Sequence, residues 1–285
     1  MAVPIVEDLL ERIHDAEGLD AVAKPVSQFV SRAVPHGPLK DALSGTWLGH
    51  PLHPMLTDVA IGSWTSAFLL DILGGEGAQQ AADTLVGAGV LSALPSAAAG
   101  LADWSDLLGA ERRVGLVHAA ANVVAVSCYS LSWLARRGGY RRRGVTLGLL
   151  GATVATVGGY LGGHLAYRQG VNVDRNAWDE GPADWVDAVA EADLADDAPA
   201  TATVGDLTVL LLRQGGSIVA LGDTCSHAGG PLHEGSISDG CVTCPWHGST
   251  FRLSDGAAVH GPATAPQPAF DIRVHDGTVQ VRRRA

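Results

Sequence analysis

Basic residues, cysteine and aromatic residues are all scarce in this chain. Its 19 Lys and Arg face 30 Asp and Glu, giving a formal net charge of −11. Such an acidic chain repels phosphate backbones, which argues against nucleic acid as a partner. Only 4 cysteines are present. Two of them, Cys128 and Cys241, lie in an apolar stretch and a strand-like stretch and are expected to be small buried hydrophobes, so a disulfide framework is not expected.

Apolar residues are abundant by contrast and unevenly placed. Hydrophobic residues make up 47% of the chain and the mean hydropathy is +0.17, which does not fit a uniformly soluble enzyme. Residues 55–165 are apolar and rich in Gly and Ala, whereas residues 1–45 are polar and mixed. Residues 1–25 lack the apolar core of a cleavable signal peptide, so none is expected.

Four segments of the apolar half are close to the ~20 residues that a bilayer-spanning helix needs. They are residues 55–73, 84–101, 114–134 and 145–165. The alternative is a soluble bundle, whose helices should each carry a charged face. The last two segments contain no Asp, Glu, Lys or Arg, and their small residues suit close packing in lipid. The pattern therefore predicts a four-helix transmembrane bundle.

The last hundred residues follow a different pattern. Short apolar runs alternate with turn signals, as expected of strands joined by tight hairpins. The runs are residues 207–213, 217–221, 270–274 and 278–282. Gly215-Gly216 and Asp276-Gly277 are typical hairpin turns. The fold class predicted for the whole chain is α + β multidomain, with the helical bundle first and an all-β domain after it.

Two short motifs in this β region carry the chemistry. Cys225-Ser-His227 is followed, sixteen residues later, by Cys244-Pro-Trp-His247. A [2Fe–2S] cluster with two thiolates on one iron and two imidazoles on the other needs this set, so Cys225 and Cys244 would hold one iron and the histidines the other. The alternative is a Cys2His2 zinc site. Zinc fingers, however, offer two cysteines and then two histidines, not two Cys-His pairs.

These motifs give the region a family resemblance. The stretches 225–232 (CSHAGGPL) and 244–251 (CPWHGSTF), with Gly261-Pro262 downstream, resemble a Rieske iron–sulfur domain over about residues 183–285. The resemblance implies a small all-β fold with both histidines at one tip. It also implies reversible one-electron chemistry.

The departures from that family pattern concern three positions. The Rieske proteins of cytochrome bc complexes, which this region resembles, have two further cysteines at the positions of Gly230 and Trp246. They have a tyrosine at the position of Phe251. The resemblance thus implies no extra disulfide and fewer hydrogen-bond donors near sulfur. Fewer donors lower the reduction potential, which is typical of a Rieske ferredoxin.

The helical half carries a second resemblance. Residues 47–58, with the sequence H-P-x-H-P, and residues 158–167 resemble a family of four-helix bacterial membrane proteins over about residues 45–170. This resemblance implies a multi-pass location in a bacterial cell membrane, in contact with lipid. It implies no reaction.

Four histidines flank the predicted spans. Antiparallel threading would place His50, His53, His118 and His164 at one face of the membrane. Ionisable groups at such positions are often functional. Two of them could be the axial ligands of haem b. They could instead donate hydrogen bonds to a quinone, or simply cap helix ends at headgroup level.

The predicted domains are an N-terminal polar segment, the transmembrane domain, a linker and the Rieske domain. Their bounds are residues 1–45, 46–170, 171–182 and 183–285. The loop 135–144 holds five arginines, and the positive-inside rule places it in the cytoplasm and the Rieske domain outside. Cytoplasmic assembly of iron–sulfur clusters argues for the opposite side, so the side stays open.

The chain is accordingly predicted to be a membrane-bound one-electron transfer protein, partnered by a redox protein or a quinone. One alternative is the electron-supplying component of a Rieske-type oxygenase or another oxidoreductase system. A self-contained oxygenase would need a further iron site of two histidines and a carboxylate, and only 38 residues follow His247. The other alternative is a non-redox membrane anchor with a Rieske fold. No oligomeric state is predicted.

Overall fold

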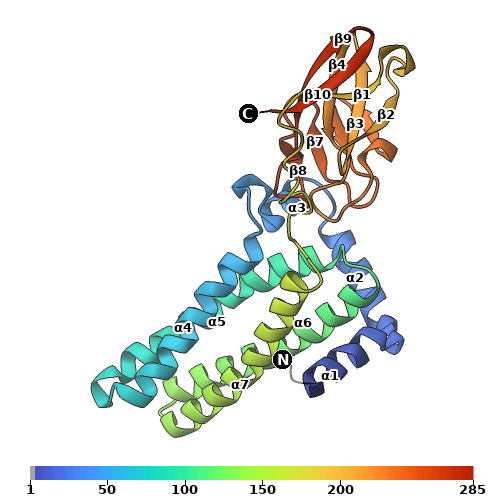
Figure 1. Cartoon of the computed structure of the whole chain (residues 1–285). Coiled ribbons are helices and arrows are strands. Elements are labelled where there is room, and N and C mark those ends of the chain that lie inside the picture. Colours follow the sequence, from blue (N-terminus) through green and yellow to red (C-terminus); the bar gives the residue numbers. More distant parts are fainter. Residues whose placement is uncertain (1–3, 285) are drawn as a thin grey trace. The chain divides into compact units, whose positions relative to one another are not determined.

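The computed structural model describes residues 4–284, which form two compact units (Figure 1). The first, here called the helical unit, comprises the chain up to residue 34 and residues 52–171. The second, the β unit, comprises residues 35–51 and the chain from residue 172 onward. Each unit has its own buried core, and each is described by itself.

Four long helices dominate the helical unit. They are α4 (Leu52–Leu73), α5 (Gln79–Trp104), α6 (Gly109–Arg137) and α7 (Arg141–Tyr167), preceded by α1 (Pro4–Asp15) and α2 (Asp20–Ala33). All four are long and apolar enough to cross a membrane. The four long apolar helices predicted from the sequence are therefore confirmed, and each extends a few residues beyond the segment expected for it.

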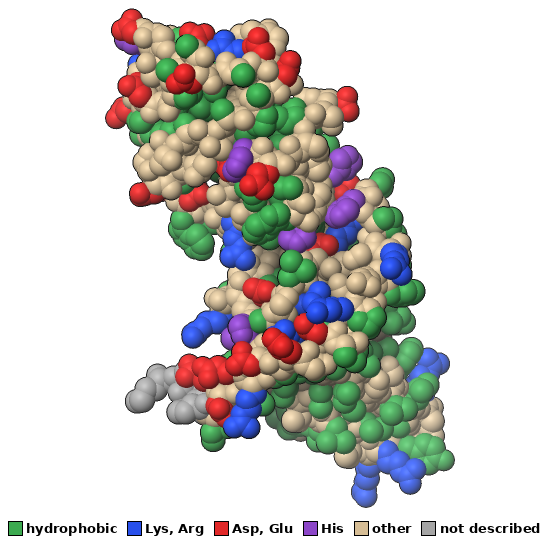
Figure 2. Space-filling model, turned by 90° about the vertical axis from the view of Figure 1, so that its right-hand side faces the viewer, with side chains coloured by type: hydrophobic (Ala, Val, Ile, Leu, Met, Phe, Trp, Pro, Cys, Tyr) green, Lys and Arg blue, Asp and Glu red, His purple; other side chains and the backbone are tan. Residues whose placement is uncertain are grey.

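The outer surface of these helices is apolar. Large hydrophobic side chains that face outward include Val59, Phe68, Ile72, Leu94 and Val123. Figure 2 shows hydrophobic side chains gathered over this part of the molecule. Water would penalise such a surface, whereas lipid favours it.

Small residues let the helices approach closely. Trp64 of α4 stacks on Tyr129 of α6 with ring centroids 4.0 Å apart. A Cβ atom at Gly89 of α5 would lie 2.2 Å from the Trp64 indole nitrogen, so only glycine fits there. Helix contact through glycine and aromatic packing is the mode expected in lipid.

A buried ion-pair network joins the four helices at one end of the bundle. Arg136 of α6 pairs with Asp71 of α4 and, at 2.9 Å, with Asp83 of α5. Arg141 of α7 pairs with the same two carboxylates. Sequence reasoning missed this network, although Asp71 and Asp83 stand at ends of apolar segments, level with the arginine-rich loop. Each helix thus contributes one charge, and the charges neutralise one another.

The β unit contains three antiparallel sheets. The first has the order β1 (Val186–Ala190), β10 (Thr278–Arg283), β9 (Phe270–His275). The second is β2 (Pro199–Val204), β3 (Leu207–Gln214), β4 (Ser217–Gly222). The third is β5 (Ser236–Ser238), β6 (Cys241–Thr243), β7 (Thr250–Arg252), β8 (Ala258–His260). The all-β prediction is confirmed.

Tight turns close two of the hairpins where they were expected. Gly215 and Gly216, between β3 and β4, have φ values of +54° and +79°. Asp276 and Gly277, between β9 and β10, have φ values of +50° and +73°. Positive φ at both central residues matches the right-handed twist of the flanking strands, which fixes their register.

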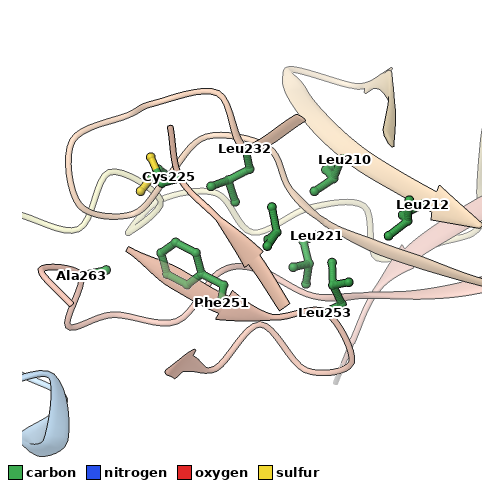
Figure 3. Close-up of a cluster of buried hydrophobic side chains, with 10 residues drawn as sticks. Leu210, Leu212, Leu221, Cys225, Leu232, Phe251, Leu253 and Ala263 are labelled. Carbon is green, nitrogen blue, oxygen red and sulfur yellow. The ribbon is translucent and has the colours of Figure 1, made fainter. Parts of the chain in front are cut away.

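An apolar core lies beneath the loops that carry the cysteine–histidine motifs (Figure 3). Leu210, Leu221, Leu232 and Phe251 are almost fully buried, and the Cys225 side chain belongs to the same cluster. Because close-packed side chains resist displacement, this core holds the base of the first motif loop in place.

The segment before the first long helix belongs to the β unit, which differs from the domain boundary placed after residue 45. It contains α3 (Pro38–Ser44) and a short 3-10 turn, Thr46–Leu48. Asp41 accepts hydrogen bonds from the Gly261 amide, at 2.7 Å, and from His260 Nδ1, at 2.8 Å. Thr46 donates to the Ala263 carbonyl oxygen. These long-range bonds leave no local trace in the sequence.

Removing the Asp41 carboxylate should loosen the β unit. An Asp41→Ala variant strands the Gly261 amide, and an unpaired donor of this kind costs about 1–3 kcal/mol of folding free energy. The variant should lower the midpoint of chemical unfolding, followed by tryptophan fluorescence of the detergent-solubilised chain. Asp193→Ala, an exposed site, is the matched control and should leave the midpoint unchanged.

Candidate metal centre

Two loops of the same construction carry the four candidate ligands. Cys225 and His227 follow β4, and Cys244 and His247 lie between β6 and β7. In each loop the cysteine carbonyl oxygen accepts a bond from the amide of a glycine four residues on, at 2.8 and 3.1 Å. In each loop the cysteine amide donates to the carbonyl oxygen five residues on, at 2.8 Å. Such tight turns point backbone amides toward the cysteine sulfur atoms.

The turns depend on glycine. Gly229 and Gly248 have φ values of +81° and +71°, in the left-handed region that side-chain-bearing residues rarely adopt. They occupy equivalent positions, four residues after Cys225 and Cys244. The sequence prediction that these glycines permit tight turns agrees with this geometry.

The loops bring the four ligand side chains together. The Cys225 and Cys244 thiols are both buried and hydrogen bonded to each other. The rings of His227 and His247 are 5.1 Å apart between centroids and nearly perpendicular. The two thiols thus form one pair of candidate ligands, and the two imidazole rings form the other. The two pairs together supply the donor set of a two-iron cluster, with two side chains for each iron.

One ring nitrogen lacks a protein partner. His227 Nδ1 is fully buried and makes no hydrogen bond. A buried polar atom without a partner costs free energy, so natural proteins rarely leave one. A bond to iron would satisfy it. The residues present therefore fit the cluster that the motif predicts.

The protonation states of the thiols favour metal binding. A hydrogen bond from Cys225 lowers the pKa of Cys244 to about 6, and the amides of Trp246 and His247 add to this shift. The same hydrogen bond between the two thiols is the main cause that raises the pKa of Cys225, and burial raises it as well. The pair thus shares one proton near neutral pH. Since the thiolate is the form that binds metal, one of the two is already prepared.

Burial prepares the histidine in a similar way. Burial, and after it the positive charge of His247, Lys40 and Arg175 nearby, lowers the pKa of His227 to about 3. The imidazole is therefore neutral at physiological pH. Neutral imidazole is the form that coordinates metal.

Gly230 and Trp246, which stand in place of an additional cysteine pair, lie in contact. A Cβ atom at Gly230 would be 2.9 Å from the Cys244 sulfur and 3.0 Å from the Trp246 ring. The Trp246 indole therefore lies beside the Cys244 ligand, where the resemblance would otherwise place a disulfide. The indole and the Cys244 sulfur leave no room for a methyl group at Gly230. Trp246 remains 56% exposed, so it also forms part of the surface.

Gly230→Ala should therefore weaken cluster retention. The added methyl group must push the Cys244 sulfur or the Trp246 ring aside, because both lie within 3.0 Å. We expect less iron per chain after purification and faster bleaching of visible absorption on storage. Gly62→Ala, at an exposed position of α4 with open space around it and no positive φ, places the same substitution away from the ligands as a control. Equal iron content in both variants would show that the contact at Gly230 is unimportant.

Two further side chains differ in the donors they offer near the centre. Ser249 is fully buried, and its Oγ accepts a bond from the Ala263 amide at 3.0 Å. Its hydroxyl proton is therefore free to be donated elsewhere. Phe251 is also fully buried but carries no hydroxyl. This agrees with the expectation of fewer donors near sulfur.

The segment ahead of α4 adds residues to this end of the β unit that the motifs did not reveal. The His36 ring lies against Gly248, whose Cβ position is 3.2 Å from His36 Nδ1. Lys40 is almost fully buried and close enough to influence His227. Both residues are nearly two hundred positions from the motifs, so no sequence spacing could have placed them there.

The four membrane-flanking histidines are not all neighbours. His53 of α4 and His118 of α6 lie together, with ring centroids 6.3 Å apart. His164 lies near Arg168 and His14. His50 is exposed and belongs to the β unit. Of these four histidines, the structure brings the rings of His53 and His118 together.

Comparison with known proteins gives two family matches in the order that the sequence predicts. A model described as Predicted membrane protein (DUF2231) matches residues 49–175. A model described as Rieske [2Fe-2S] domain matches residues 184–271.

Curated relatives match the β part of the chain. Anthranilate 1,2-dioxygenase ferredoxin subunit of Burkholderia cepacia is 35% identical over 99 residues, which cover 35% of this chain and 92% of that protein. Ferredoxin CarAc of Metapseudomonas resinovorans is 33% identical over 27% of this chain and 73% of that protein. Human Apoptosis-inducing factor 3 is 39% identical over 26% of this chain, but only 12% of that protein is spanned.

The high coverage of the ferredoxin subunits, together with the paired loops and the unpartnered His227 nitrogen, identifies the β part. The helical part is a predicted membrane domain with four apolar helices. This chain belongs to the Rieske [2Fe–2S] family, with ferredoxin-type electron-transfer relatives and a membrane domain ahead of the Rieske domain.

Proposed function

We propose that this protein is a membrane-bound one-electron carrier. In this proposal it exchanges electrons with a redox partner protein and, within the membrane, with a haem or a quinone. The observation that carries the proposal is the convergence of two buried thiols and two imidazoles, with His227 Nδ1 left unpartnered. No catalytic residue is proposed, and the chain acts as a carrier or oxidoreductase subunit.

Each of the two irons would be held by two of the four ligands. Cys225 and Cys244 hold one iron, and His227 and His247 hold the other. A bound [2Fe–2S] cluster supplies reversible one-electron transfer. The protein exposes Trp246 beside the His247 ring, 6.4 Å away between centroids, as a surface that a redox partner can contact.

Charge favours a particular kind of redox partner. The β unit contains about twice as many Asp and Glu as Lys and Arg. A partner with a basic docking face would be steered toward it, at rates that fall with ionic strength. An acidic partner would be repelled.

The proposed location is a bacterial cell membrane, with α4 to α7 spanning the lipid. The exposed apolar side chains of these helices support it, as does the match to a membrane protein family. The domains proposed from the sequence are a polar segment (1–45), a transmembrane domain (46–170), a linker (171–182) and the Rieske domain (183–285), with residues 35–51 packed in the β unit.

A second candidate function is electron supply to a Rieske-type oxygenase. The names of two relatives favour it, since one is a dioxygenase ferredoxin subunit and the other a ferredoxin. In that case the acceptor is a soluble oxygenase, and the helices serve as an anchor.

Reoxidation kinetics separate the two functions. The full chain is purified in detergent, reduced with dithionite and freed of excess reductant. It is then mixed either with a soluble quinone analogue or with an oxygenase component, and recovery of visible absorption is followed. If the protein exchanges electrons within the membrane, its visible absorption should recover rapidly with the quinone analogue or through a bound haem. Recovery that occurs with the oxygenase component and not with the quinone analogue supports the second function. Absence of any reducible chromophore would contradict both.

A further inference from the structure

Two imidazole rings face each other inside the helical unit. His53 lies in the first turn of α4 and His118 within α6, with centroids 6.3 Å apart and planes at 83°. Neither ring has a carboxylate hydrogen-bonded to it among the described residues. Ionisable side chains inside a membrane bundle are costly and are usually retained for function.

Hydrogen bonds fix where the proton lies on each ring. His53 Nδ1 is 2.8 Å from the Ser96 carbonyl oxygen, and His118 Nδ1 is 2.8 Å from the Gly158 carbonyl oxygen. A carbonyl oxygen can only accept, so each Nδ1 must carry a proton and donate it. In the neutral imidazole Nε2 is then an acceptor with a free lone pair. The same arrangement orients histidines that ligate metals.

Neighbouring amide groups leave the lone pair of His118 open. Asn122 Nδ2 lies 3.1 Å from His118 Nε2 and 3.4 Å from His118 Nδ1. A donor aligned with the Nε2 lone pair would be much farther from Nδ1, on the opposite side of the ring. The Asn122 amide therefore lies against the face of the ring, off the line of the Nε2 lone pair, and it donates one of its two protons to the His118 carbonyl oxygen at 2.9 Å.

Glycines on the other two helices make room for the rings. A Cβ atom at Gly100 of α5 would lie 2.8 Å from His53, and one at Gly162 of α7 would lie 3.0 Å from His118. Each ring is thus held by a carbonyl oxygen and a glycine of its hairpin partner. His53 is positioned by α5, and His118 by α7.

We propose that His53 and His118 are the axial ligands of a porphyrin iron bound between the α4–α5 hairpin and the α6–α7 hairpin. Their separation suits this role, because two bonds of about 2 Å, plus half the width of each ring, span such a distance. The helices pack more closely within each hairpin than between hairpins, and the two proposed ligands come from different hairpins. This inference rests on, and deepens, the membrane exchange in the proposed function.

Other ligands fit the pair less well. A structural zinc ion takes four protein ligands, and no group of three or more metal-binding side chains occurs among residues 4–284. A quinone carbonyl needs a hydrogen-bond donor, but the only ring N–H groups are already bound to carbonyl oxygens. The pair offers two lone pairs, which is what a metal with two open axial positions requires.

The test uses the full chain purified in detergent after addition of haemin. A Soret band and a pyridine haemochrome spectrum are expected, with at least tenfold lower haem occupancy in His53→Ala and in His118→Ala. His50→Ala and His164→Ala should keep full occupancy. Imidazole added to a His118→Gly variant should restore the band, which excludes a mere folding defect.

Electron paramagnetic resonance of the reduced samples reports the Rieske centre independently. Its signal should persist in all four alanine variants, so loss of haem with the signal intact supports the site. No Soret band in the parent chain, or a full band in the His53→Ala/His118→Ala double variant, would overturn the inference. Loss of the Rieske signal from the parent chain would instead count against the proposed function.

Discussion

Cys225→Ser will abolish the paramagnetic signal of the reduced protein and remove iron from the chain. The side chain is 1% exposed, lies in the apolar core cluster and is hydrogen bonded to the Cys244 thiol. A serine hydroxyl is too weak an acid to replace a thiolate ligand, and a cluster missing one ligand is lost. We expect complete loss rather than a graded decrease, measured by electron paramagnetic resonance and iron content.

Cys241→Ser provides the matched control for that variant. Cys241 lies in β6, three residues before Cys244, and is half-buried. The same chemical change at this position should leave the signal and the iron content intact. A normal signal in Cys225→Ser, or equal losses in the two variants, would contradict the assignment of the ligands.

Arg136→Ala will destabilise the helical unit by about 3–5 kcal/mol, since it strands a buried carboxylate. Arg136 is 6% exposed and pairs with Asp71, which has 7% of its side chain exposed, and with Asp83. Arg141 still contacts both acids but cannot neutralise two charges alone. The expected result is a large decrease in the thermal midpoint of the detergent-solubilised protein, followed by far-ultraviolet circular dichroism.

Two companion variants show whether the stranded charge is the cause. Arg142→Ala removes an exposed arginine six positions away and should change the midpoint little. Arg136→Met combined with Asp71→Leu removes both partners and should recover much of the lost stability. If the double variant is as unstable as Arg136→Ala alone, packing rather than charge holds the helices together.

The elements that sequence predicted well are those with a local signal. The four long helices follow from uninterrupted apolar length, and the two hairpin turns follow from Gly215-Gly216 and Asp276-Gly277. The convergence of the four candidate ligands follows from the spacing of two short motifs. In each case the residues that determine the feature lie within about 20 positions of one another along the chain. The fold class predicted from the sequence is confirmed, and the role of the four candidate ligands stays a prediction.

What sequence did not provide depends on contacts between distant positions. The Asp41 bonds to Gly261 and His260 join residues about 220 positions apart, so the assignment of residues 35–51 to the β unit had no local cue. The selection of His53 and His118 from four histidines required helix packing, because antiparallel threading gives only the end of a helix and not its facing side. The same holds for the Arg136 network.

The most direct test of the central claim is metal and sulfide analysis combined with electron paramagnetic resonance on the purified full chain. The account predicts iron and acid-labile sulfide in equal amounts, silence in the oxidised state and a signal that appears on one-electron reduction. Stoichiometric zinc with no sulfide, and no signal after reduction, would contradict it.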